Sequence, residues 1–303
     1  MNNKYLPLSD VQRSYFYGRS KGTFLGGIST HFYIECMTSL DKDKLEKALN
    51  SVIKEQPSLR SYITSDGMQC CMDEAPEYYR IKETDISRLS YEEQEKKLLE
   101  IRKRCSNRIF DLDSWPMFEF NICITGRDKN VMIIDSDMMI MDGLSTEILI
   151  ESLYKYYEKD EPVREISIEA FEDHIALKEQ KKAKNYDNDK AFWKEIIEEL
   201  PSGPHFERTG GNEERTFDTR EISVPADKWG AKSRELKSER ILPSVYLTAA
   251  YAKLLSRWCG QSRITLNMTM SNRKGNAKAL LNAIGDFTEV MLVDFDFSMK
   301  KSL

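Results

Sequence analysis

The stretch Asp135-Ser136-Asp137-Met138-Met139-Ile140-Met141-Asp142-Gly143-Leu144-Ser145 decides the fold, because it places carboxylates in a water-avoiding segment and then turns. The apolar residues from Val131 to Met141 predict a buried strand, where carboxylates are costly unless they are paired or hydrogen-bonded. Gly143 permits a turn, and Ser145 can cap the helix that follows. Asp142 is therefore expected at a strand-to-helix corner. One alternative is that Asp142 and Ser145 only hold this corner together.

The segments around this stretch alternate between strand and helix patterns. Phe118 to Thr125 and Val131 to Asp137 predict two strands joined by a hairpin. Leu144 to Tyr157 and Asp41 to Lys54 carry apolar residues at helical spacing. This order predicts a sheet covered by helices, which is an α/β (α+β) arrangement. Two further expected strands are Thr30 to Cys36 and Leu59 to Thr64.

The length of 303 residues is enough for two lobes, each with its own core. The charged, proline-ended segment from Lys159 to Pro162 is a natural boundary. We therefore expect an N-terminal lobe over residues 1–160 and a second lobe over residues 161–303.

Composition excludes several classes of partner. The 45 basic and 50 acidic residues give a net charge of −5 with both signs interspersed, so nucleic acid is not an expected partner. No apolar run reaches the length of a membrane span, and the start lacks a secretion signal, so we expect a cytoplasmic protein. Six cysteines and three histidines show no metal-ligand spacing, and we expect reduced thiols and no metal site.

Several polar motifs follow one another along the chain. One of them places an asparagine inside a strand pattern, where asparagine is unfavoured. The motifs are Pro7-Leu8-Ser9 with Gln12, Tyr15 and Gly18-Arg19; Asp137, Asp142 and Ser145; Asn267 with Asn272-Arg273; and Gly285-Asp286-Phe287-Thr288.

In this order the motifs resemble the heterocyclization domains of nonribosomal peptide synthetases, a branch of the condensation-domain superfamily. The resemblance covers essentially the whole chain. It implies two αβ-sandwich lobes like chloramphenicol acetyltransferase, the second incomplete, because such domains continue past the Gly285 to Thr288 block into further motifs. It also implies condensation of a carrier-bound acyl thioester with carrier-bound cysteine, serine or threonine, followed by cyclodehydration to a thiazoline or oxazoline.

The resemblance also implies partners and site residues. Substrates would arrive on the phosphopantetheine of upstream and downstream carrier proteins, with neighbouring synthetase domains as partners and no cofactor bound directly. Asp137, Asp142 and Ser145 would form the catalytic motif. Residues that line the substrate tunnel or bridge the lobes would be Asn267, Asn272, Arg273, Asp286 and Thr288.

The chemistry of the residues refines these roles. Ordinary condensation domains carry a histidine at the position of Met138, and methionine cannot accept a proton. We expect Asp142 to pair with Arg273 across the lobes, because a bidentate arginine–carboxylate pair satisfies two otherwise uncompensated groups. Asp137 is the tunnel-facing candidate, with a merely hydrogen-bonded strand-end carboxylate as the alternative. Asp286 and Thr288 are as consistent with fixing a turn.

Two other functions remain open from the sequence. A degenerate relative could act only as a docking module for carrier proteins. A simple acyltransferase of the same fold would need a histidine base, which the motif lacks. Because the threonine and aspartate implicated in cyclodehydration have no counterpart before Leu303, we expect ring formation by this chain alone to be impaired.

Overall fold

The computed structural model describes residues 3–20, 22–23, 26–159, 161–162, 165–206, 222–273 and 280–298. The chain divides into two compact units, residues 1–183 with 271–289, and residues 184–270 with 290–303. Residue 160, the expected lobe boundary, lies outside the described residues, and that boundary stays a prediction. Within the described part of the chain, every helix is too short or too polar to cross a membrane.

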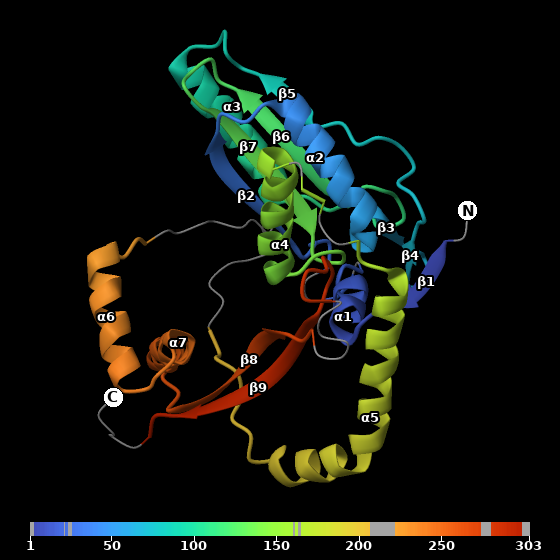
Figure 1. The fold of residues 1–303 in the computed structure, drawn as a ribbon. Helices are drawn as coiled ribbons and strands as arrows, with labels where there is room; N and C mark the ends of the chain where they lie inside the picture. The colour runs from blue at the N-terminus through green and yellow to red at the C-terminus, as the bar shows by residue number, and fades with distance from the viewer. Residues whose placement is uncertain are drawn as a thin grey trace. The chain divides into compact units, whose positions relative to one another are not determined.

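The first unit is built on a four-stranded sheet of order β2-β7-β6-β5 (Figure 1). Strands β2 (His31–Thr38), β7 (Asn130–Asp137) and β6 (Phe118–Ile124) pair antiparallel, while β5 (Lys82–Asp85) pairs parallel to β6. The expected hairpin of β6 and β7 is therefore confirmed. The helices of this unit are α1 (Asp10–Gly18), α2 (Lys42–Glu55), α3 (Tyr91–Ser106), α4 (Gly143–Tyr154), η2 (Lys155–Lys159) and the N-terminal part of α5 (Ile168–Ile196).

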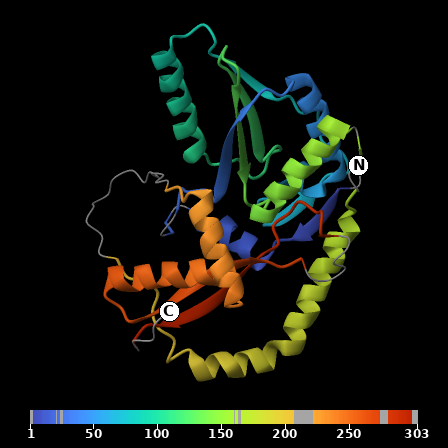
Figure 2. The ribbon, with the colours of Figure 1, turned by 60° about the vertical axis from the view of Figure 1, so that its left-hand side comes forward.

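Strand β7 is buried on both faces of this sheet, since its side chains alternate between the faces and nearly all of them are buried. On β7, Met132 and Ile134 join the core that α2 and α4 cover, whereas Val131 and Ile133 join the core that α3 covers. Figure 2 shows α3 on one side of the sheet and α2 with α4 on the other. The central strand therefore has no solvent-facing side for its aspartates.

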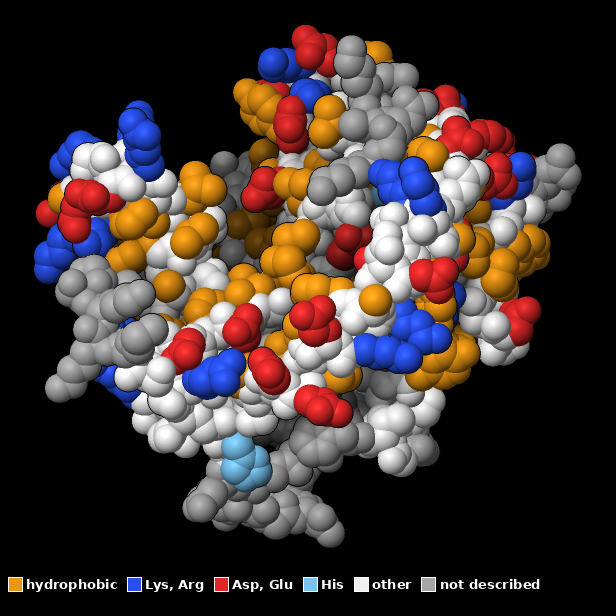
Figure 3. Space-filling view, turned by 90° about the horizontal axis from the view of Figure 1, so that it is seen from below, with side chains coloured by type: hydrophobic (Ala, Val, Ile, Leu, Met, Phe, Trp, Pro, Cys, Tyr) orange, Lys and Arg blue, Asp and Glu red, His pale blue; other side chains and the backbone are white. Residues whose placement is uncertain are grey.

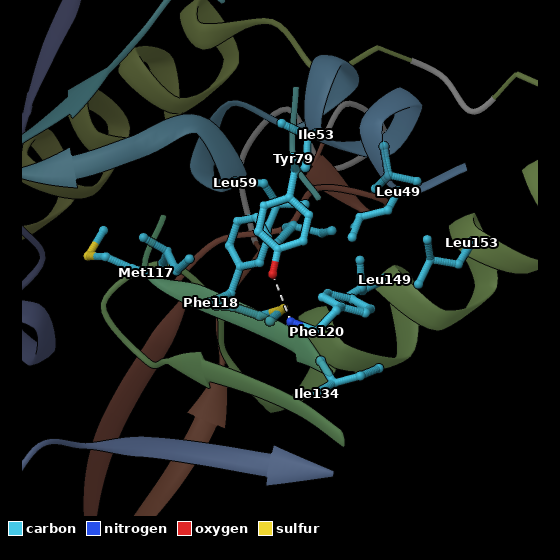
Figure 4. Packing of buried hydrophobic residues seen from close by; sticks show 14 of the residues in the cluster. Leu49, Ile53, Leu59, Tyr79, Met117, Phe118, Phe120, Ile134, Leu149 and Leu153 are labelled. Carbon is cyan, nitrogen blue, oxygen red and sulfur yellow. Dashed lines mark hydrogen bonds between the residues drawn. The ribbon is translucent and has the colours of Figure 1, made fainter. Parts of the chain in front are cut away.

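The larger core lies between the sheet, α2 and α4 (Figure 4). Aromatic rings of Tyr79, Phe118 and Phe120 pack against each other at its centre, with ring centroids 4.9 to 6.4 Å apart. The backbone N–H of Phe120 donates to the Tyr79 hydroxyl at 2.8 Å, so this hydroxyl is satisfied within the core. Leu49 and Leu149, both almost fully buried, bring the two helices onto this aromatic centre.

A second sheet of the first unit has the order β1-β4-β3, with β1 (Lys4–Pro7), β4 (Met68–Cys71) and β3 (Ser61–Ile63). The strand expected from Leu59 to Thr64 is shorter than predicted. A 3-10 helix over Pro57–Arg60 takes its start, since a proline favours the first position of a helix.

The second unit contains α6 (Ala226–Ser238), α7 (Pro243–Cys259) and the strand pair of β8 (Arg263–Ser271) with β9 (Thr288–Asp296). Ser271 and the first two residues of β9 belong to the first unit. The small core of the second unit consists of Ala252, Leu255 and Ile264. On the face of the molecule in Figure 3, acidic and basic side chains are interspersed, in keeping with the nearly balanced composition.

Candidate functional site

The predicted corner is present, with its helix starting earlier than expected. β7 ends at Asp137, and α4 begins at Gly143 with Asp142 as its N-cap. The prediction that Ser145 caps this helix is wrong. Because Gly143 and Leu144 are already helical, Ser145 occupies the third helical position, and its backbone N–H donates to Asp142 Oδ1 at 2.8 Å.

Asp142 pairs with Arg273, as the sequence predicts. Arg273 Nη2 donates to Oδ1 at 3.0 Å and Nη1 donates to Oδ2 at 3.1 Å, which makes the pair bidentate. The Arg273 and Asp142 side chains are only 5% and 4% exposed. Burial raises the pKa of Asp142, but the hydrogen bonds from Arg273 and Ser145 and the charge of Arg273 outweigh burial and lower the pKa overall.

The pair lies inside the first unit, where it ties the corner to a distant segment. Arg273 and the residues up to 289 belong to the same compact unit as Asp142, so the pair does not join the two units. The backbone N–H of Phe287 also donates to Asp142 Oδ2 at 3.3 Å, and that of Asp142 donates to the Gly285 carbonyl at 3.1 Å. Asp142 is thus a hub between α4 and the segment near Gly285.

The hydroxyl of Ser145 completes this hub. Its oxygen accepts from Arg273 Nη2 at 2.9 Å and from the Gly285 backbone N–H at 3.1 Å. Its single proton faces Asp142 Oδ1 at 2.7 Å and the Gly285 carbonyl at 2.9 Å. All its hydrogen-bonding capacity is used within the protein, which fits a structural role, and the catalytic role of Ser145 stays a prediction.

Asp137 is also held on both carboxylate oxygens, and its side chain is fully buried. Arg19 Nη2 donates to Oδ1 at 2.6 Å, and the backbone N–H of Met139 donates to the same oxygen at 2.9 Å. The hydroxyl of Ser29 donates to Oδ2 at 2.9 Å. The alternative of a hydrogen-bonded strand-end carboxylate therefore describes this geometry.

Two residues of this arrangement were missed at the level of the sequence. Arg19 stood in the first motif without an assigned partner, although a buried strand-end carboxylate calls for a cation. Its Nε and Nη1 are buried and have no hydrogen-bond partner among the residues that the structure describes. No local pattern in the sequence indicated a role for Ser29, because the carboxylate that it binds, Asp137, lies 108 residues further along the chain.

Asp286 and Thr288 lie beside a pocket of about 300 Å³ that α5 and the segment from Leu6 to Arg13 also line. Asp286 accepts from the Ser9 hydroxyl at 3.0 Å and from the Thr288 backbone N–H at 3.2 Å. Burial raises the pKa of Asp286, and the hydrogen bonds from Thr288 and Ser9 only partly oppose it.

The two asparagines fall in different units. The backbone N–H of Asn272 donates to the Phe287 carbonyl at 2.7 Å, which aligns the segments of Arg273 and Asp286. Asn267 is exposed on β8 in the second unit. The described residues contain no group of three or more His, Cys, Asp or Glu side chains that could hold a metal ion.

The chain is similar to known proteins in both sequence and fold. The family model of the condensation domain matches residues 2–303. The chain belongs to the condensation domain family. Bacitracin synthase 1 of Bacillus licheniformis is 27% identical over 304 residues. Phenyloxazoline synthase MbtB of Mycobacterium bovis is 26% identical over 297 residues, and pyochelin synthetase PchF of Pseudomonas aeruginosa is 25% identical over 295 residues.

These alignments cover 96% of this condensation domain chain but only 6%, 21% and 16% of those proteins, respectively. Among solved structures, the cyclization-docking bidomain of EpoB from Sorangium cellulosum superposes with a TM-score of 0.84 at 26% identity, over 98% of this chain and 60% of that one. The first condensation domain of the CDA synthetase superposes with a TM-score of 0.77 at 17% identity, over 99% of this chain and 71% of that one, which concerns the fold alone. The predicted α/β condensation fold is confirmed.

Proposed function

We propose that this chain is part of a heterocyclization domain of a nonribosomal peptide synthetase. It would join a carrier-bound acyl thioester to the amine of a carrier-bound cysteine, serine or threonine, and then close the side chain onto the new amide with loss of water. The observation that carries the proposal is the corner motif, in which Asp142 and Ser145 form one hydrogen-bonded unit with Arg273 while Asp137 is held separately by Arg19. The likeness to the EpoB cyclization-docking bidomain supports it.

The residues at the corner fit a reaction that depends on positioning. Met138 occupies the place where a histidine base would stand, and both Asp137 and Asp142 are engaged by arginines. A free base is therefore missing from the corner itself. Bringing amine and thioester together in the correct orientation lowers the barrier of amide formation substantially without a strong base.

The partners follow from the proposed reaction. Both substrates would be thioesters on the phosphopantetheine arms of carrier proteins, one upstream and one downstream of this domain. The EpoB cyclization-docking bidomain, which resembles this chain over 98% of its length, is by name part of a nonribosomal peptide synthetase.

A reconstituted assay tests the proposal. The 303-residue chain is incubated with an acyl-loaded donor carrier and a cysteine-loaded acceptor carrier, and the acceptor is read by intact mass. The expected product is the acceptor carrier with the condensed acyl group, with little or none of the species lighter by one water, because ring formation by this chain alone is expected to be impaired. Carriers that bind the chain without forming the condensed product would refute the enzymatic proposal and favour a docking module.

A further inference from the structure

One face of α1 is directed at the corner segment. Gln12, Tyr15 and Arg19 follow each other at spacings of three and four, so they lie along the same side of the helix. Gln12 Nε2 donates to the Met139 carbonyl at 2.7 Å, and Arg19 Nη2 donates to Asp137 at 2.6 Å. Tyr15 stands between these two anchored neighbours and therefore faces the same segment.

Tyr15 differs from its neighbours because its hydroxyl is not engaged. Gln12 is buried and Arg19 is held in an ion pair, whereas Tyr15 is half-buried, with its ring against the main core. Within the described part of the chain, the structure gives its hydroxyl no hydrogen-bond partner. A polar group in such a place is free to bind a molecule that reaches the corner.

The electrostatic surroundings of Tyr15 indicate which kind of group it can bind. Burial, followed by the charges of Asp286, Asp137 and Asp142, raises the pKa of Tyr15 to about 12. The phenol stays un-ionised at neutral pH, and three carboxylates, two of them paired with arginines, lie near enough to act on it. Nearby carboxylates favour a ligand group that carries or develops positive charge.

We propose that the Tyr15 hydroxyl contacts the acceptor substrate, and that its oxygen accepts a hydrogen bond from the attacking amine. This inference rests on the proposed function. In the condensation step the amine nitrogen bonds to the acyl carbon, the carbon–sulfur bond of the thioester breaks, and the departing sulfur takes up the proton that the nitrogen releases. The nitrogen becomes positively charged as it attacks, so a contact to it strengthens in the transition state.

The first test compares two phenylalanine variants. Tyr15→Phe keeps the ring in the core and removes only the hydroxyl. We expect the maximal rate of condensation to fall about 10- to 100-fold, the loss typical of one hydrogen bond to a charged group. The concentration of donor carrier at half-maximal rate should stay unchanged. Tyr17→Phe, on the same helix with its side chain 63% exposed, is the matched control and should condense at the wild-type rate.

The second test detects the contact without turnover. 3-Fluorotyrosine at position 15 preserves the size of the ring and reports on its surroundings by its fluorine resonance. The resonance should move when cysteine-loaded acceptor carrier is added, and should stay in place with an acceptor whose amine is acetylated. Equal shifts with both acceptors would overturn the amine contact.

The outcomes of these tests distinguish a failure of the role proposed for Tyr15 from a failure of the proposed function. A wild-type chain that condenses its substrates together with a fully active Tyr15→Phe variant overturns the role of Tyr15 and leaves the proposed function intact. A wild-type chain that forms no product refutes the proposed function and, with it, the role of Tyr15 in condensation.

Discussion

The ion pair of Asp142 and Arg273 provides the sharpest test of how the corner is held. Replacing Asp142 with alanine removes the acceptor of two guanidinium hydrogen bonds and of the helix-capping bond from Ser145. Arg273 then stays buried with its charge uncompensated. The Ser271 hydroxyl and the Ala283 carbonyl, which also contact its guanidinium group, carry no charge to replace the carboxylate.

The size of the effect follows from this burial. Removing one partner of a buried ion pair costs about 3 to 5 kcal/mol, because the remaining charge has been taken out of water. For a unit of this size, such a loss corresponds to a fall in Tm of roughly 6 to 20 °C. Replacing both residues with apolar ones, Asp142→Leu with Arg273→Met, should restore much of the loss, since no uncompensated charge is left.

Thermal unfolding of the wild type, of Asp142→Leu and Arg273→Met singly, and of the double variant measures this coupling directly. The matched control is the pair of Arg102 and Glu35, which is also bidentate, at 2.8 and 2.6 Å, but is 33% and 27% exposed. Glu35→Ala should cost no more than about 1 kcal/mol.

Dependence on pH checks the same pair independently. Because the pKa of Asp142 in the folded chain is lowered, its contribution is present at neutral pH and is lost as the pH falls through that value. The gap between wild type and Asp142→Ala should therefore narrow in acid. A single Asp142→Ala variant with the wild-type Tm at pH 7 would refute the reasoning.

Three further substitutions probe the surroundings of the corner, each by thermal unfolding. Asp135 is buried on β7; burial, only partly opposed by the charges of Arg108 and His31, raises its pKa from 3.8 to about 6, which corresponds to about 3 kcal/mol. The free-energy cost of ionising Asp135 in the folded chain grows as the pH rises from 3.8 to about 6 and reaches its full value above that pH. Asp135→Asn should therefore stabilise the chain more at pH 7.5 than at pH 5. Equal gains in stability at the two pH values would contradict this. Gly285→Ala would place a Cβ 2.9 Å from two phenylalanine rings and should lower the free energy of unfolding by about 1 to 3 kcal/mol. An unchanged Tm would show that the two rings move aside without a measurable cost. Arg19→Gln leaves the buried carboxylate of Asp137 without its cation and should cost about 3 kcal/mol; a neutral outcome would mean that Ser29 and the Met139 N–H hold that charge on their own.

Chemistry made the central strands and the Asp142–Arg273 pair predictable. β7 carries an apolar run bounded by charged residues, and its burial on two faces leaves each carboxylate in need of a partner. The pairing needed only the identity of the two groups and their positions after buried segments. Their separation of 131 residues did not matter to that argument.

The parts that were missed lacked a local signal. Strands β1, β4 and β5 have four residues each, too few to display a period, and their pairing is decided by partners far along the chain. The helix cap was assigned to Ser145 because serine is a common N-cap, but Asp142, three residues earlier, caps the helix by accepting the backbone N–H of Ser145. Asp142 and Ser145 are both suitable N-cap residues, and only the backbone conformation shows which of the two begins the helix.

The engagement of both aspartates changes how kinetic data on this corner should be read. Asp137 ties the end of β7 to α1 through Arg19, and Asp142 ties the start of α4 to the segment near Gly285. Since α1 also carries Tyr15, loss of the Arg19 contact would shift the phenol relative to the corner. A slow Asp137 variant is therefore no evidence that Asp137 transfers a proton. Only a rate loss at unchanged Tm, in a chain whose Tyr15 fluorine resonance still responds to the acceptor amine, would place the carboxylate in the reaction itself.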